Sequence, residues 1–261
     1  MNMPNLPDIP SLSEMRDGVR DGMAEVRESI SDARQDAKAL LAAVKPKLRG
    51  WLHLVMAPLA LIAGIVLIAT SDTTSGRVGA IVFTITAVLL FGTSAVYHRG
   101  TWSPGTAMTL RRMDHANIFL IIAGTYTPFA LTLLPAAEAR SLLIIVWTGA
   151  ILGVCFRVFW TGAPRWLYVP VYLALGWVAV FYVKPMLHGG GPAVLTLIIT
   201  GGALYTIGAI IYGTKRPNPS PRWFGFHEIF HTFTILAFVV HYVAASMAIY
   251  GHDVTATTLA H

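Results

Sequence analysis

Seven long apolar stretches divide this 261-residue chain, and they constrain its fold more than any other feature. Each is about 20 residues long, the length that an α-helix needs to cross the hydrocarbon core of a bilayer. Turn-forming or charged segments separate them. The sequence therefore predicts an all-α membrane protein, a seven-transmembrane helix bundle over residues 51–250, with helices at about 51–70, 77–97, 113–134, 141–160, 165–184, 192–213 and 226–250.

The composition agrees with a membrane protein and indicates its partners. The chain is 55% hydrophobic and only 12% charged, whereas soluble domains average roughly 25% charged residues. Residues 1–50 carry eight acids and eight bases, so the net charge of +6 belongs to the remainder. Basic residues beside apolar spans are typical of topology signals and lipid-headgroup contacts. We therefore expect membrane lipids as partners and no nucleic acid.

The distribution of lysine and arginine predicts the orientation in the membrane. With a cytoplasmic N-terminus, eleven basic residues near the ends of the spans lie inside the cell, and three, namely Arg77, Arg140 and Lys184, lie outside. Positive charge favours the cytoplasmic side. We expect a multi-pass protein of the cell (inner) membrane, with its N-terminus inside and a short external tail at residues 251–261.

Residues 1–50 form a separate, cytoplasmic extension with the pattern of an amphipathic helix. Ser11 and Glu14 fit a capping box at the start of a helix. Apolar residues then recur with alternating spacings of four and three, as in a heptad seam: Val19, Met23, Val26, Ile30, Ala33, Ala37, Leu40 and Val44. Self-association through this helix, contact with the bilayer, and a solvated extension without chemistry all fit the pattern.

Three histidines and a carboxylate are predicted at one depth of the bundle. His227 and His231 lie four residues apart, so they share a helix face and could share a metal ion. His98 ends the second span and Asp114 opens the third, and the predicted topology puts all four at cytoplasmic helix ends. Ser94 lies one turn before His98. A polar group inside a membrane segment is costly and indicates a functional or structural role.

Three imidazoles suit Zn²⁺ and leave a position for water, as in catalytic zinc sites. Asp114 can hold that water and take its proton, and Ser94 can orient the water or a substrate carbonyl. The alternative is a buried polar network without metal. His241 shares the face of His227, but fourteen residues place it about 21 Å along the axis. We therefore exclude it from the same metal.

Two more histidines are interpreted as lying outside the set of metal ligands. His115 follows Asp114 directly and so points about 100° away from it, which makes it a neighbour of the site. His53, at the start of the first span, is expected to be exposed or interfacial. The run His227-Glu228-Ile-Phe-His231 also matches H-E-x-x-H, in which the glutamate is the base of a zinc protease. That hypothesis needs a third ligand, for which His98 is the natural donor.

Motifs in three helices resemble the hemolysin III family, the bacterial branch of the progestin and adipoQ receptor superfamily. They are Ser94-Ala-Val-Tyr-His98, Met113-Asp114 with Gly124-Thr-Tyr-Thr-Pro128, and His227-Glu-Ile-Phe-His231. The resemblance covers about residues 45–250. It implies a seven-helix bundle with its N-terminus inside and zinc near the cytoplasmic face, bound by His98, His227 and His231. Asp114 would contact the zinc through water, and Ser94 would lie beside the ligands or the substrate.

The family is similar to alkaline ceramidases, which hydrolyse a lipid amide, and this likeness suggests a function. Our first hypothesis is a zinc-dependent membrane hydrolase of a lipid amide or ester. The alternatives are a non-enzymatic sensor or homeostasis protein with structural zinc, a channel or cytolysin as the family name implies, and an intramembrane zinc protease. The charged N-terminal extension departs from the compact family pattern.

Overall fold

The computed structural model describes residues 12–43, 46, 48–160 and 162–259, and the chain divides into two compact units, Met1–Lys45 and Pro46–His261. In the first unit, the described residues form one helix, α1, which runs from Leu12 to Ala43. Ser11 of the predicted capping box lies outside the described residues. The first members of the predicted heptad seam are largely exposed: Val19, Met23, Val26 and Ile30.

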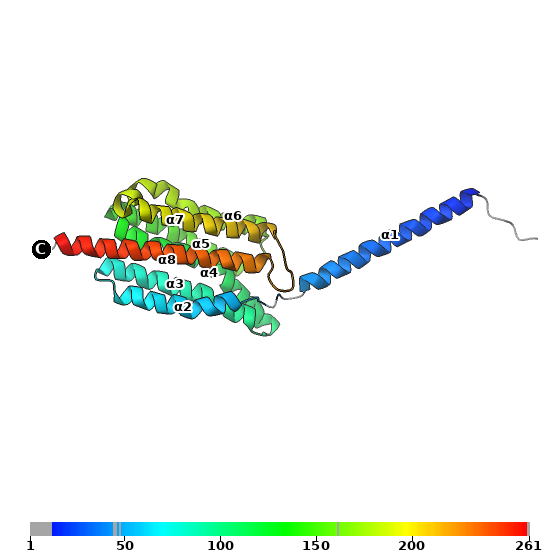
Figure 1. Cartoon of the computed structure of the whole chain (residues 1–261), viewed down its shortest axis with the longest axis horizontal. Helices are drawn as coiled ribbons and strands as arrows, with labels where there is room; N and C mark the ends of the chain where they lie inside the picture. The colour runs from blue at the N-terminus through cyan, green and yellow to red at the C-terminus, as the bar shows by residue number, and fades with distance from the viewer. Residues whose placement is uncertain (1–11, 44–45, 47, 161, 260–261) are drawn as a thin grey trace, which may run out of the picture. The chain divides into compact units, whose positions relative to one another are not determined.

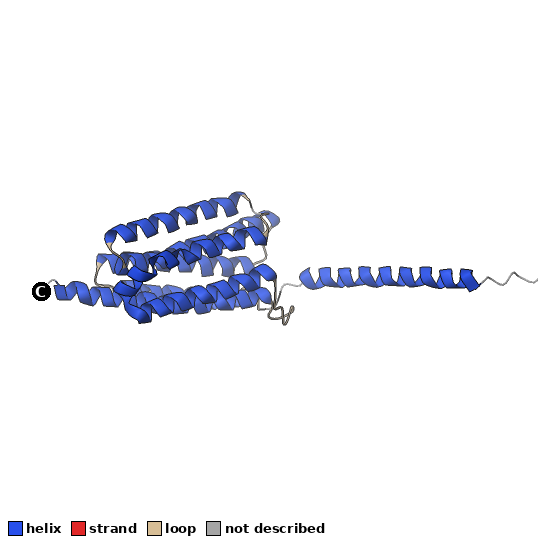
Figure 2. Ribbon diagram, turned by 90° about the horizontal axis from the view of Figure 1, so that it is seen from above, coloured by secondary structure: helices blue, strands red, loops and turns tan. Residues whose placement is uncertain are grey.

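The second unit is a helical bundle (Figures 1 and 2). Its described residues contain helices and one isolated bridge between Ser220 and Phe224. The helices are α2 (Trp51–Ala69), α3 (Thr74–Arg99), α4 (Pro104–Leu133), α5 (Ala136–Phe159), α6 (Arg165–Gly176), the 3₁₀ helix η1 (Trp177–Tyr182), α7 (Val183–Thr214) and α8 (Phe226–Leu259).

Local sequence signals set the starts of two helices that reach the candidate site. The Thr73 side chain accepts a hydrogen bond from the Gly76 amide and so caps α3. Ser103 does the same for Thr106 in α4, and Pro104 occupies the first turn, where its missing N–H has no consequence. Helix α4 therefore begins nine residues before the predicted position 113. Hydropathy misses these first turns because they are polar.

Helices α6, η1 and α7 form one apolar run of 50 residues, Arg165–Thr214, that is interrupted at Gly191. Gly191 has φ 72° and ψ 177°, a conformation that L side chains rarely adopt. Arg165 donates to the Tyr212 carbonyl and Trp177 donates to the Thr206 hydroxyl. Positions early in the run thus pair with positions late in it, so the run folds back on itself. The break lies between the two predicted helices at 165–184 and 192–213.

Helix α4 lies at the centre of the bundle. Of its most apolar window, 78% is buried, against 22% for α2. Large apolar side chains such as Ile62 of α2, and Ile144 and Leu152 of α5, are instead exposed on the outside. Soluble proteins do not expose apolar surface on this scale. Six described helical segments are long and apolar enough to cross a membrane. The fold is that of a multi-pass membrane protein.

Candidate metal centre

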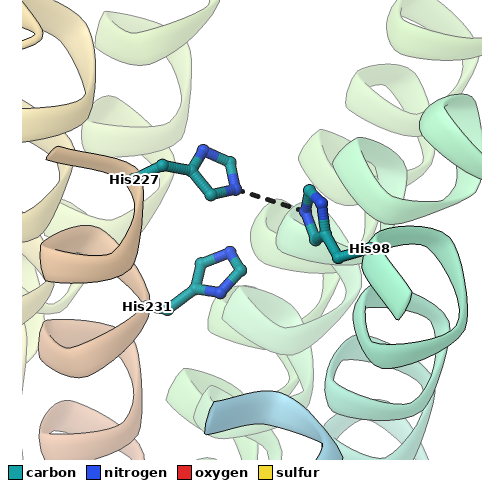
Figure 3. Close-up of side chains that lie close together, drawn as sticks. All are labelled: His98, His227 and His231. Carbon is teal, nitrogen blue, oxygen red and sulfur yellow. Dashed lines mark hydrogen bonds between the residues drawn. The ribbon is translucent and has the colours of Figure 1, made fainter. Parts of the chain in front are cut away.

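The side chains of His98, His227 and His231 converge (Figure 3), and all three lie near helix ends at one end of the bundle. His98 lies in the last turn of α3, and the other two lie in the first turns of α8. One ring nitrogen from each histidine lies within 4.8 Å of one from each of the others. The Nε2 atoms of His98 and His227 are 3.2 Å apart. Helices distant in sequence therefore bring three imidazoles together, those of His98 and His231 buried and that of His227 half-buried.

The arrangement of the three rings fits a zinc ion. Zinc–nitrogen bonds of about 2.0–2.1 Å in a tetrahedron separate neighbouring ligand atoms by about 3.4 Å. The 3.2 Å separation of His98 and His227 is close to that value, and a ring nitrogen of His231 lies within 4.8 Å of a ring nitrogen of each. His98 and His231 are 7% and 3% exposed. Three imidazoles, two of them buried and that of His227 half-buried, are a donor set typical of catalytic zinc.

Asp114 and Ser94 border this cluster. An Asp114 carboxylate oxygen lies 3.8 Å from His98 Nε2, too far for a direct hydrogen bond but close enough for both to contact one water. The Ser94 hydroxyl is buried one turn before His98, facing the Asp114 carboxyl without regular hydrogen-bond geometry. All five predicted site residues thus lie near one another.

His53 is buried beside the cluster, and the expectation of an exposed or interfacial residue is wrong. It is 2% exposed, and its ring stacks on that of His231 with centroids 3.8 Å apart and planes 10° from parallel. Phe91 also packs edge-on against it, with ring centroids 5.0 Å apart. The predicted topology could have indicated this position, because it puts the start of the first span at the same depth as His98, His227 and His231. The parallel stack fixes the plane of His231.

Glu228, the glutamate of the H-E-x-x-H string, makes structural contacts. Its Oε1 accepts a hydrogen bond from Arg49 Nε at 2.8 Å, and its Oε2 accepts one from the Gly225 amide at 2.9 Å. The carboxylate is 1% exposed. It therefore joins the segment before α2 to the start of α8 and caps that helix. These contacts occupy both oxygens, which disfavours a role as the base of a protease.

His115 and His241 lie outside the three-histidine group. His115 Nδ1 lies 2.8 Å from the Arg111 carbonyl, and its Nε2 lies 3.2 Å from the Tyr212 hydroxyl. A carbonyl only accepts, so Nδ1 carries the hydrogen and Nε2 faces Tyr212. His241 contacts the backbone of α7 through the Ile198 carbonyl. Both side chains have hydrogen-bond partners of their own.

A cavity of about 170 Å³ extends from the three-histidine cluster into the bundle. Asp114, His227 and His231 line it near the cluster, while Tyr205 and His241 line it farther along α7 and α8. Most of the remaining wall is apolar. Trp177, Val180 and Ile199 also line the cavity and are each more than two-fifths exposed. Part of the wall between η1 and α7 is therefore at the outer surface of the bundle.

Comparisons with known proteins identify the family of this chain. The family model described as "Haemolysin-III related" matches residues 41–242. The "Hemolysin-3 homolog" of Bacillus subtilis (strain 168) is 34% identical over 154 residues, which are 59% of this chain and 69% of the relative. "Hemolysin-3" of Bacillus cereus is 32% identical over 176 residues, 67% of this chain and 77% of the relative.

A more distant match extends beyond bacteria. The "Progestin and adipoQ receptor-like protein 1" of Caenorhabditis elegans is 25% identical over 188 residues, which are 61% of this chain and 41% of that protein. The family match includes α3 and α4 and the part of α8 that carries His227 and His231. The chain therefore belongs to the hemolysin III family, within the progestin and adipoQ receptor superfamily.

Proposed function

We propose that this protein is a zinc-dependent membrane hydrolase that cleaves an amide or ester bond in a lipid. The observation that carries the proposal is the position of the three-histidine cluster at one end of an apolar cavity. A structural zinc site needs four protein ligands and no adjoining cavity. Three ligands, a nearby carboxylate and an apolar chamber together fit hydrolysis of a bond attached to a hydrocarbon chain.

His98, His227 and His231 hold the zinc in this proposal. Bound zinc lowers the pKa of water towards ~7 and polarises a carbonyl oxygen. Asp114 orients the attacking water by hydrogen bonding and accepts its proton, and then returns a proton to the leaving amine or alcohol. Ser94 donates a hydrogen bond to the substrate carbonyl. His53 keeps the His231 ring in its plane through the stack.

The cavity supports a lipid as the substrate. An apolar chamber with a few polar groups at one end suits a molecule with a long hydrocarbon chain and a polar linkage. The exposed cavity-lining side chains Trp177, Val180 and Ile199 lie where hydrocarbon would cover the bundle. A lipid substrate would therefore enter from the bilayer between η1 and α7.

We further infer seven membrane crossings with the metal centre on the cytoplasmic side of the cell (inner) membrane. The run Arg165–Thr214 folds back at Gly191, so it accounts for two crossings, and five other segments account for the rest. The eleven-to-three distribution of basic residues supports an internal N-terminus. A reporter fused after His261 should be active only outside the cytoplasm; cytoplasmic activity would contradict this orientation.

A second candidate function is membrane permeabilisation, which two relatives carry in their names. The exposed apolar seam of α1 favours this function, because several copies of the protein could associate through that helix and build a larger assembly. Leakage of a trapped dye from vesicles that contain the purified protein tests it. Leakage that disappears with Met23→Glu, while zinc content is unchanged, would favour permeabilisation over hydrolysis.

The test of the hydrolase proposal is turnover by purified, detergent-solubilised protein. Short-chain ceramides and related lipid amides and esters are the substrates, and released fatty acid is the product measured. Activity that is lost with His231→Ala supports the proposal. A wild-type protein that contains zinc, but hydrolyses none of these lipids, would favour a sensor or homeostasis protein with structural zinc.

A further inference from the structure

The part of the cavity distant from the zinc cluster contains two polar groups that the proposed hydrolysis does not use. His241 of α8 and Tyr205 of α7 both line the cavity there. Their rings stack with centroids 5.7 Å apart and planes 24° from parallel. His241 is 6% exposed, and the Tyr205 hydroxyl is buried. Polar groups at this depth of a membrane protein usually have a function.

The hydrogen bonds of His241 define what the pair can bind. Its Nε2 lies 3.2 Å from the Ile198 carbonyl, which only accepts, so Nε2 carries the ring hydrogen. In the neutral ring, Nδ1 is then an acceptor, and it has no hydrogen-bond partner in the described part of the chain. The Tyr205 hydroxyl, a donor and acceptor, likewise has none among the described residues. Leaving such buried groups unpaired destabilises the fold.

The fold holds this pair in place. The His241 ring packs directly on Gly201, where an added Cβ would lie 2.6 Å from the ring. Gly201 and the bond to Ile198 thus set the position of the ring against α7. A residue that served only to join α7 and α8 would need Nε2 alone. The unpaired Nδ1 and the Tyr205 hydroxyl are buried atoms of two residues that line the cavity, and neither is needed for that contact.

The distance from the metal centre matches the length of a lipid chain. His241 follows His231 by ten residues on one helix, which is about 15 Å along the axis. Half of the hydrocarbon core, the space of one leaflet's chains, is also about 15 Å. A chain whose amide or ester lies at the zinc cluster would therefore bring its far end to Tyr205 and His241.

We propose that Tyr205 and His241 form a subsite for a hydroxyl group near the far end of a lipid hydrocarbon chain. A hydroxyl donates to His241 Nδ1 and accepts from the Tyr205 O–H, so it satisfies both groups at once. A ketone or ether cannot donate to Nδ1, and a plain methyl end satisfies neither group. This inference rests on the proposed function in one respect: the amide or ester bond of the lipid lies at the three-histidine cluster.

The test is competitive binding to zinc-loaded, full-length protein in detergent, with a fluorescent fatty acid as the displaced probe. The competitors are hexadecanoic acid and its ω-hydroxy derivative, and the measured quantity is the ratio of their affinities. The two acids differ in their free energy of transfer out of water, but this difference is the same for every variant. It therefore cancels when the ratio is compared between variants. Tyr205→Phe should lower the preference for the ω-hydroxy acid about tenfold, since the hydrogen bond from the Tyr205 O–H is lost.

Two controls define the subsite. The 2-hydroxy acid, whose hydroxyl lies beside the carboxyl group, should show no dependence on Tyr205. His241→Leu should lower the ω-hydroxy preference as Tyr205→Phe does, and Gly201→Ala should do so by displacing the ring.

An unchanged ratio in a Tyr205→Phe protein that binds hexadecanoic acid normally would overturn the subsite and leave the hydrolase proposal standing. A wild-type protein that binds neither acid would overturn the subsite together with the acyl-chain cavity. A wild-type protein that hydrolyses no lipid, but still prefers the ω-hydroxy acid in a Tyr205-dependent way, would instead contradict the hydrolase proposal alone.

Discussion

Replacing Glu228 by glutamine distinguishes a structural carboxylate from a protease base. The wild-type carboxylate accepts from Arg49 Nε at 2.8 Å and from the Gly225 amide at 2.9 Å. Hydrogen bonds to charged groups contribute about 1.5–3 kcal/mol each. Breaking a fully buried ion pair costs about 3–5 kcal/mol, but here Arg49 is 24% exposed and can be rehydrated. Glutamine keeps one oxygen acceptor.

We therefore expect Glu228→Gln to lower stability by about 1.5–3 kcal/mol. For a domain of this size, that corresponds to a decrease in melting temperature of about 3–12 °C. Zinc content and turnover per folded molecule should stay near wild-type values, because neither oxygen of Glu228 faces the cluster in these contacts. The assays are thermal unfolding in detergent, metal analysis, and lipid-amide hydrolysis on the same samples.

A double-mutant cycle sharpens this test. Arg49→Met should cause a similar loss of stability, and the double variant should lose less than the sum of the two single changes, since both remove one interaction. The reasoning is wrong if Glu228→Gln unfolds at the wild-type temperature while turnover falls about a hundredfold or more. That result would make Glu228 the base, as the H-E-x-x-H interpretation requires.

Two further predictions concern the surroundings of the three-histidine cluster. Asp114→Asn should keep most of the zinc while reducing turnover by about 10²–10⁴, the typical effect of losing a general base; a parallel loss of stability and activity would indicate a structural role instead. His53→Leu should weaken zinc binding in chelator competition by about tenfold, the low end for residues that orient ligands. His53→Phe, which keeps a ring against His231, should bind zinc more tightly than His53→Leu, and equal affinities would contradict the stacking argument.

The depth of the site was predictable from sequence, whereas its assembly was not. Hydropathy and the distribution of basic residues predicted that His98, Asp114, His227 and His231 lie at helix ends on one side of the membrane, and the structure has them near one another. Which helices are neighbours depends on the packing of many side chains around α4, and that packing leaves no single pattern in one sequence. The structure brings the first turns of α8 to the last turn of α3.

The residues that sequence reasoning missed are those whose environment decides their role. His53 lies at the predicted depth, but a lone histidine at a helix start gives no sign that it stacks on His231. Tyr205 is one aromatic residue in an apolar run, and only the cavity distinguishes it. The chain reversal was predictable, since Gly189-Gly-Gly-Pro192 separates the two apolar stretches, and the break occurs at Gly191.

Metal analysis of the purified protein tests the central claim most directly. Wild-type protein should contain about one zinc per chain, and His98→Ala, His227→Ala and His231→Ala should each lose most of it, because three protein ligands leave no redundancy. His241→Ala, which removes a buried histidine about 15 Å from His231 on the same helix, should retain the metal. Zinc that persists in all three ligand variants, or that is lost equally with His241→Ala, would contradict the assignment of His98, His227 and His231 as the metal site.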